Sequence, residues 1–346
     1  MFQSYLVITL DRAVLFVDLA KITDDVQDYL TKFGVETREY IEVWTYLRKF
    51  EWGEGKVRLS LRSGFPRSQC AFPKVIIAPE TSYAVALMLT HFRYTTAPSF
   101  VSSMKAVKNG TEIQGMRDAY LRDGVSFVKF LAWLEEKLLQ GYAISEYEAA
   151  FRLTEYRRGN DHFMGLAYEN ISASGPNAAL PHYSPTKSTA ATIDRDVPYL
   201  NDSGGQYKDG TCDTTRTWIF GRPTDQHCEA YTRVLQGHIA IDNAIFPEGT
   251  SGHQLDVLAR NALWRGCMDY GHGTGHGVGS FLNVHESGPS FSNDTPLVPG
   301  NVITNEPGYC GCPLLIYLSE ADIYLYPRPS RGMGHPYRIR PPRNIN

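Results

Sequence analysis

The sequence predicts an α/β (α+β) protein in which a larger domain follows a smaller α/β domain. Three observations support this fold class. The first hundred residues alternate strand-like and helix-like segments, a long helical pattern then reaches Gln140, and the second half contains short β-branched runs separated by glycine and proline turns. With 346 residues, the chain is long enough to form two domains with sizeable cores.

Residues 1–103 form the predicted smaller domain. We expect strands over 4–10, 12–18, 35–40 and 74–79, and helices over 21–34, 42–50 and 81–92. Thr23 and Thr81 are candidate N-caps, and Gly34 is a helix stop. Asp11-Arg12 interrupts the apolar opening, which has no basic leader, so a hairpin fits this opening better than a signal peptide.

Residues 104–323 form the predicted larger domain, which the segment 97–110 links to the first. A capping box at Thr111–Gln114 predicts a helix reaching Gln140, and a second at Ser145–Glu148 predicts a helix ending near Gly159. Further helical patterns cover 225–246 and 252–264. The Pro/Arg-rich tail, 324–346, is expected to be irregular, with neither a strand pair nor an amphipathic helix.

Composition excludes several classes of partner. A net charge of −3 and a pI near 6.4 give no basic surface for nucleic acid or an anionic membrane. No run of 18 apolar residues predicts a membrane span. The 6 cysteines lack the spacing of a disulfide framework, so a reducing, cytoplasmic location is expected.

The stretch from Tyr199 to Thr217 indicates a two-stranded ribbon carrying two carboxylates, Asp202 and Asp213. Glycines 204, 205 and 210 supply the bends that bring the strands together. Two carboxylates at close range raise each other's pKa, so such a pair usually surrounds a divalent cation. The alternative is an ordinary hairpin with two solvated aspartates, and further ligands must decide between them.

Candidate ligands follow downstream. Residues 272–286 hold three histidines interleaved with glycines, and His276 is the second histidine of the HGTGHG motif. Glu306 ends an apolar β run that Pro307-Gly308 stops, and Glu320 comes 14 residues later (320 − 306). Two Asp, one His and two Glu suit a pair of Mn²⁺, Co²⁺ or Zn²⁺ ions better than a thiolate zinc site.

The order and spacing Asp, Asp, His, Glu, Glu resembles the dinuclear metallopeptidases of the pita-bread fold. The strings LAYENISASGPNAALPHYSP, YLNDSGGQYKDGTCDTTRT, HGTGHGVGSFLNVHE and NEPGY are most similar to the X-Pro aminopeptidases (aminopeptidase P) within that group. The likeness covers about residues 1–309. It implies a pita-bread catalytic domain preceded by the middle domain of that family.

The resemblance also assigns roles to single residues. It implies that Asp202 ligates one metal, that Asp213 and Glu320 bridge both, and that His276 and Glu306 complete the other, most typically with Mn²⁺. Two such ions can share a hydroxide that is nucleophilic at neutral pH. His285 and His182 match substrate-contacting histidines with catalytic roles, and a homodimer is one assembly compatible with the resemblance. His272 matches the wall of the proline pocket, and Tyr168 matches a tyrosine near the metals.

The implied reaction is hydrolysis of the N-terminal X-Pro bond of peptides. That bond is an imide without an N–H, so it needs a dedicated pocket, and the specificity for proline rests on the resemblance alone. The X-Pro dipeptidases are the nearest enzymatic competitor.

One departure opens a second reading. The family's final Glu lies in a G-x-R-x-E pattern, whereas Ile316 to Glu320 read IYLSE and lack the Gly and the Arg. Ile316, Leu318 and Glu320 still alternate as on one strand. The alternatives are an X-Pro metallo-aminopeptidase, with low activity because the Arg is missing, and a non-catalytic pita-bread domain that binds peptide or a protein partner.

Overall fold

The computed structural model describes residues 3–49, 74–89 and 93–309, and the backbone of 310–311, 314–317, 319–322 and 337–338. The chain divides into two units, Met1–Ser99 and Phe100–Asn346. The boundary predicted after residue 103 falls inside the helix α4 (Phe100–Ala106), which belongs to the larger unit.

The smaller unit contains a three-stranded sheet in the order β1-β2-β3. The hairpin expected at the start of the chain is present, because β1 (Ser4–Ile8) pairs antiparallel with β2 (Ala13–Val17), and β3 (Val35–Glu39) joins β2 in parallel. The other elements are η1 (Leu19–Lys21), α1 (Asp24–Lys32), α2 (Glu42–Lys49), β4 (Val75–Ile77), α3 (Tyr83–Met88) and β5 (Tyr94–Thr96). Phe16, Tyr46 and Leu89 lie in its buried core.

Two of the three cap predictions for this unit hold. Thr23 occupies the N-cap position of α1, and Gly34 follows the helix with a φ of 69°. The Thr81 prediction is wrong, because Ser82 occupies the N-cap of α3. Both residues are polar and adjacent, so sequence alone does not decide which of them adopts the extended conformation that a cap requires.

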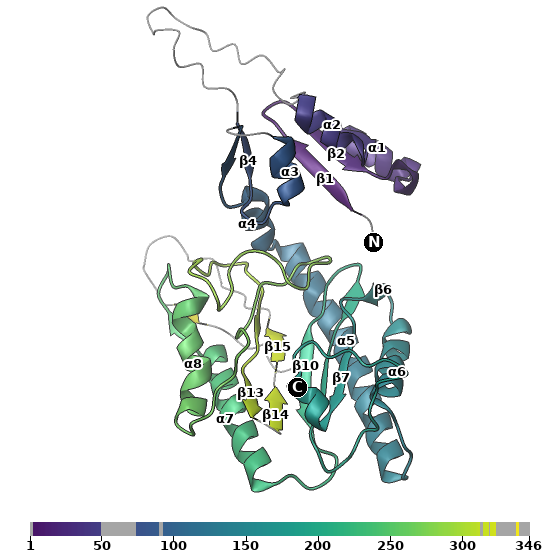
Figure 1. The fold of residues 1–346 in the computed structure, drawn as a ribbon, viewed down its shortest axis with the longest axis vertical. Helices are drawn as coiled ribbons and strands as arrows, with labels where there is room; N and C mark the ends of the chain where they lie inside the picture. The colour runs from purple at the N-terminus through teal and green to yellow at the C-terminus, as the bar shows by residue number, and fades with distance from the viewer. Residues whose placement is uncertain are drawn as a thin grey trace, which may run out of the picture. The chain divides into compact units, whose positions relative to one another are not determined.

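The larger unit is built around a five-stranded antiparallel sheet in the order β12-β15-β10-β8-β7 (Figure 1). Its strands are β7 (Ile171–Ser174), β8 (Tyr199–Ser203), β10 (Thr214–Trp218), β12 (Ile303–Asn305) and β15 (Ser319–Asp322). The short strands β6 (Phe163–Leu166) and β9 (Gly205–Tyr207) pair beside it, as do β13 (Gly308–Gly311) and β14 (Leu314–Tyr317).

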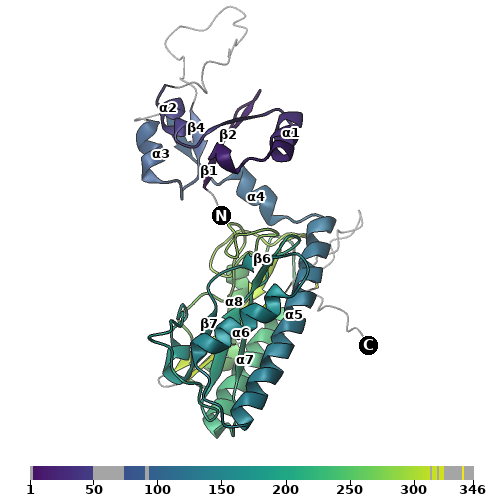
Figure 2. The same ribbon diagram turned by 90° about the vertical axis from the view of Figure 1, so that its right-hand side faces the viewer.

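Helices flank this sheet in two pairs. The helix α5 (Gly110–Leu139) runs the length of the unit beside α6 (Glu146–Arg158), as Figure 2 shows, and α7 (Asp225–Asp242) packs on α8 (Gly252–Trp264). Phe130, Leu134 and Leu153 are fully buried between α5 and α6. Among the described residues, no helix combines the length and apolar character needed to cross a lipid bilayer.

Three predictions for the larger unit need correction. The cap of α5 is Asn109 rather than Thr111, since the Asn109 side chain accepts hydrogen bonds from the amides of Thr111 and Glu112. The pattern over 225–246 is not one helix, because α7 ends at Asp242 and β11 (Ile245–Phe246) follows. The tail does contain a strand, β16 (Tyr337–Arg338), which pairs with β11 through two residues. The remainder of 324–346 lies outside the described residues.

Candidate metal centre and active site

The predicted ribbon is present and brings its two aspartates together. Strand β8 pairs with β10 so that Asp202 lies opposite Thr215, two residues beyond Asp213. Gly204 makes the close return possible, because a Cβ at this position would lie 1.7 Å from the Cys212 carbonyl oxygen. The Tyr168 hydroxyl lies between the two carboxylates, hydrogen-bonded to Asp202 and at 2.7 Å to Asp213 Oδ1.

His276 and Glu306 reach the same place from neighbouring segments. The His276 segment runs beside β12, with the Thr304 amide donating to the His276 carbonyl at 2.8 Å and the Glu306 amide donating to the Thr274 carbonyl at 2.7 Å. His276 Nε2 lies 3.3 Å from Asp213 Oδ2 and 3.0 Å from Glu306 Oε1. The ligand atoms of Asp213, His276 and Glu306 all lie within 4.8 Å of one another, which is close enough to share one ion.

The electrostatics of this cluster fit a cation. Burial, and then the neighbouring Asp213, raise the pKa of Asp202 well above its usual range. Burial opposes a charge on His276, but the hydrogen bonds to Asp213 and Glu306 outweigh it and raise its pKa to about 11. The proton on His276 therefore supplies positive charge between carboxylates, as a divalent ion would. Three carboxylates and one imidazole suit Mn²⁺, Co²⁺ or Zn²⁺.

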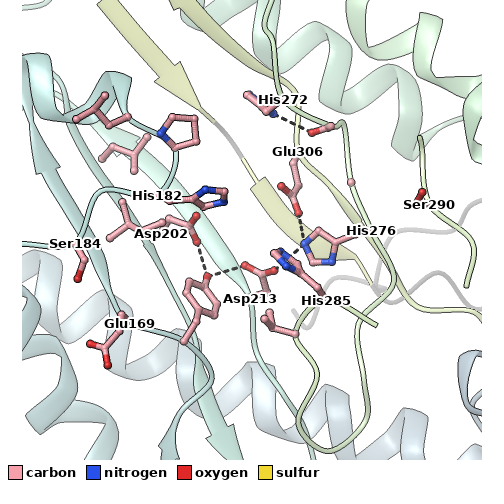
Figure 3. Close-up of a pocket in the computed structure, with 18 of the residues that line it drawn as sticks. Glu169, His182, Ser184, Asp202, Asp213, His272, His276, His285, Ser290 and Glu306 are labelled. Carbon is pink, nitrogen blue, oxygen red and sulfur yellow. Dashed lines mark hydrogen bonds and ion pairs between the residues drawn. The ribbon is translucent and has the colours of Figure 1, made fainter. Parts of the chain in front are cut away.

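A cavity of about 690 Å³ opens over the cluster (Figure 3). All the candidate site residues whose side chains the structure describes line this cavity. His182 and Asp202 come from one wall, while His272, His276 and His285 come from the other. The rings of His276 and His285 lie 4.2 Å apart at an interplanar angle of 82°. Burial, and then the adjacent His276, lower the pKa of His285, so its imidazole is neutral at pH 7.

His272 and His182 occupy different settings in this cavity. The His272 ring stacks on Tyr270 at 4.6 Å, and burial lowers its pKa. His182 is exposed and lies on the loop after η4 (Gly175–Ala179). Leu180, Pro181, Ile171 and Val284 add apolar surface to the lining. The cavity thus combines a polar, charged floor with partly apolar walls, as ligand sites commonly do.

Glu320 is described through its backbone. It belongs to β15, where it lies opposite Thr214 on β10 and Asn305 on β12. Residues directly opposite one another on antiparallel strands share a face of the sheet. Thr304, whose hydroxyl accepts from the His276 amide, lies opposite Ala321 rather than Glu320. In this register Glu320 lies opposite Asn305, the residue after Thr304, and therefore does not share a face of the sheet with Thr304. The role of Glu320 as a metal ligand stays a prediction.

One strand was expected to run through Ile316, Leu318 and Glu320, but Ile316 and Glu320 belong to different strands, and Leu318 lies outside the described residues. Strand β14 ends at Tyr317 and pairs with β13, whereas β15 begins at Ser319 and joins the five-stranded sheet. Simple alternation along the chain predicted one face for the three residues. Because β14 and β15 pair with different strands, the alternation of side chains along β14 does not predict the face of Glu320 on β15.

Sequence analysis missed two groups that support the site. The Tyr120 hydroxyl accepts from the Asp213 amide at 3.0 Å, although the position reads as one more apolar residue of a helix. Lys108 forms an ion pair with Glu286, the neighbour of His285, and their side chains are 1% and 5% exposed. A lysine and a glutamate that are 178 residues apart carry no sequence signal that they pair.

Comparison with known proteins places the chain in a family. Residues 114–327 match the model of metallopeptidase family M24. The chain belongs to this family. Residues 1–112 match the creatinase/prolidase N-terminal domain. The M24 match passes Tyr309, where we expected the resemblance to end, and includes Glu320.

Curated relatives in the M24 family are similar over most of this chain. The probable Xaa-Pro aminopeptidases P of Laccaria bicolor and Sordaria macrospora are 44% and 42% identical over 313 and 317 residues. These alignments cover 89% of this chain but 46% and 50% of the relatives. The chain spans about half the length of the curated relatives it matches.

Solved structures of peptidases are also similar to this chain. An X-prolyl aminopeptidase from Caenorhabditis elegans, described as a cytosolic enzyme with a di-nuclear active site, superimposes with a TM-score of 0.86 and 32% identity. That match covers 98% of this chain and 55% of the other. The prolidase from Pyrococcus furiosus, at 21% identity and a TM-score of 0.70, shares the fold. The pita-bread fold expected from the motifs is thus confirmed.

Proposed function

We propose that this chain is a metal-dependent aminopeptidase that removes the residue preceding proline from the N-terminus of peptides. The observation that carries the proposal is the convergence of Asp213, His276 and Glu306, with Asp202 held beside them through Tyr168. Relatives named Xaa-Pro aminopeptidase P support the substrate class. The same relatives make the non-catalytic reading the less favoured one.

Four described residues are the proposed metal ligands, namely Asp202, Asp213, His276 and Glu306. We assign them to a pair of divalent ions, most typically Mn²⁺, in line with the di-nuclear site of the nematode enzyme. When bound, such a pair activates water at neutral pH and polarises the scissile carbonyl. Glu320 is the candidate fifth ligand, and it would need a one-residue shift of β15 to share a face with Thr304.

Contact with the substrate and proton transfer are the proposed roles of the histidines that line the cavity. His285 is neutral at pH 7 and adjacent to His276, so it can donate a hydrogen bond to the substrate or move a proton. His182 faces it from the other wall and is the second candidate for contact with the peptide. His272, on its stack with Tyr270, is the candidate wall for the proline ring.

The physiological setting follows the same proposal. The substrates are peptides with proline in second position, and neither nucleic acid nor a membrane is a proposed partner. A cytoplasmic location agrees with the unpaired thiols of Cys212, Cys228 and Cys267 and with the cytosolic nematode enzyme. A homodimer stays a prediction.

Peptide hydrolysis tests the proposal directly. The purified chain, loaded with Mn²⁺, should release the first residue from an X-Pro-Pro tripeptide but not from an X-Ala-Ala tripeptide, and EDTA should stop the reaction. Asp202→Asn should abolish it, whereas Asp161→Asn, at an exposed aspartate, should leave it unchanged. An X-Pro dipeptide separates this activity from that of a dipeptidase. Binding of the tripeptide without hydrolysis would favour the non-catalytic alternative.

A further inference from the structure

The cavity wall that carries His182 is a loop without regular secondary structure for most of its length. It leaves β7 at Ser174, passes through η4 and includes Ala178, Leu180, Pro181, His182 and Ser184, all of which line the cavity. His182 itself is exposed. An exposed histidine on a loop holds a fixed position only if the surrounding backbone is anchored.

One buried carboxylate supplies that anchor. Glu146, at the first turn of α6, is 0% exposed. Its Oε1 accepts from the Ser174 amide at 2.6 Å, and its Oε2 accepts from the Tyr183 hydroxyl at 2.6 Å and the Ala191 amide at 2.8 Å. The Asn177 side-chain amide lies 3.1 Å from both oxygens. The carboxylate thus ties both ends and the middle of the loop to one point.

We infer that Glu146 is a positioning residue for substrate recognition, which acts by holding the 174–191 loop so that His182 faces the metal centre. The inference rests on the proposed function, because it gives His182 a substrate to contact. Tyr183 is the direct connection, since it is the neighbour of His182 and donates to Glu146.

The chemistry of the contact explains why a glutamate occupies this site. The groups that donate to Glu146 are uncharged amides and a hydroxyl, and hydrogen bonds to a carboxylate are stronger than those between neutral groups. The amino end of α6 adds a favourable field for negative charge. Burial, and then Glu146, raise the pKa of Tyr183 to about 12, so its hydroxyl remains a donor at neutral pH.

Two variants and a control test the anchor without relying on catalysis. In Glu146→Gln, one acceptor oxygen becomes an amide group, so hydrogen exchange at the amides of Ser174 and Ala191 should accelerate by roughly tenfold or more. Tyr183→Phe removes one contact and keeps the ring. Glu148→Gln is the matched control, because Glu148 lies on the same turn and bonds to Ser145 instead of the loop. Unchanged exchange in Glu146→Gln would overturn the inference.

A double-mutant cycle tests whether the anchor acts through His182. Tyr183→Phe should lower kcat/KM for the X-Pro-Pro tripeptide by roughly 10- to 100-fold, the cost of a misplaced contact group. In a His182→Ala background the same change should cost less than about twofold, since coupled sites are not additive. Full additivity would overturn the link to His182. If the wild type hydrolyses nothing, the proposed function fails, and the exchange measurement still decides the role of Glu146.

Discussion

Metal binding by the metal-free chain should release protons and strengthen steeply as the pH rises. His276 must lose its proton before Nε2 can bind an ion. Burial disfavours that proton, but the contacts to Asp213 at 3.3 Å and Glu306 at 3.0 Å outweigh burial and raise the pKa to about 11. At pH 7 only about one imidazole in 10⁴ is then deprotonated, which weakens the apparent affinity by about 5 kcal/mol.

The direction in which metal affinity changes with pH follows from the linkage between proton binding and metal binding. Below the pKa of His276, the logarithm of the metal association constant should rise by about one for each pH unit. Asp202, whose pKa burial and Asp213 also raise, adds to this slope wherever its carboxyl is still protonated. In the metal-free protein, the charged His276 stabilises the fold below its ordinary pKa of 6.5, and this stabilisation disappears as the pH rises through about 11.

Titration calorimetry measures both the affinity for the metal and the number of protons released on binding. Mn²⁺ is added to the EDTA-treated, dialysed chain between about pH 6 and pH 8, in pairs of buffers with different ionisation enthalpies, and the difference in heat counts the protons released. We expect about one proton or more for each chain at pH 7, because each chain has one His276. His285→Ala is the control, because that neighbouring imidazole is already neutral and should not alter the count. An affinity independent of pH, or no release of protons, would refute the reasoning.

Four further changes probe other parts of the site. His285→Ala should lower turnover by roughly 10² to 10⁴ while the metal content by atomic absorption stays constant; unchanged turnover would make His285 a scaffold residue. Tyr168→Phe should cost the metal-free protein about 1.5–3 kcal/mol in urea unfolding, since it removes a donor to two carboxylates, and equal stability would contradict this. Lys108→Met should cost about 1.5–3 kcal/mol, since the buried Glu286 then keeps only the half-exposed Lys105, at 3.4 Å, as a cationic partner, whereas an unchanged urea midpoint would mean the pair contributes little. The double change Ile316→Gly and Leu318→Arg, which restores the G-x-R-x-E pattern, should raise X-Pro-Pro turnover by about 10- to 150-fold; equal rates would show that the departure is harmless.

The sequence by itself determined the elements of the site that depend on local chemistry. The ribbon could be predicted because β-branched residues and glycines fix both the strands and the bends within 19 residues, 199 to 217. The ligand types and their order indicated the metal chemistry before any geometry was known. Ser145 and Glu148 likewise form the capping box that their spacing predicts, since such a box involves one turn of chain.

Only the tertiary structure decided the contacts between distant segments. Glu146 reads as an ordinary first-turn acid of α6, yet it gathers donors from residues up to 45 positions away. Lys108 and Glu286 pair across 178 residues, and Tyr120 supports Asp213 across 93. The register of β15, which sets the position of Glu320, depends on its pairing with β10 and β12 rather than on its own alternation. The physical reason is that hydrogen bonds and ion pairs form between groups that folding brings together, and their sequence separation leaves no pattern to read.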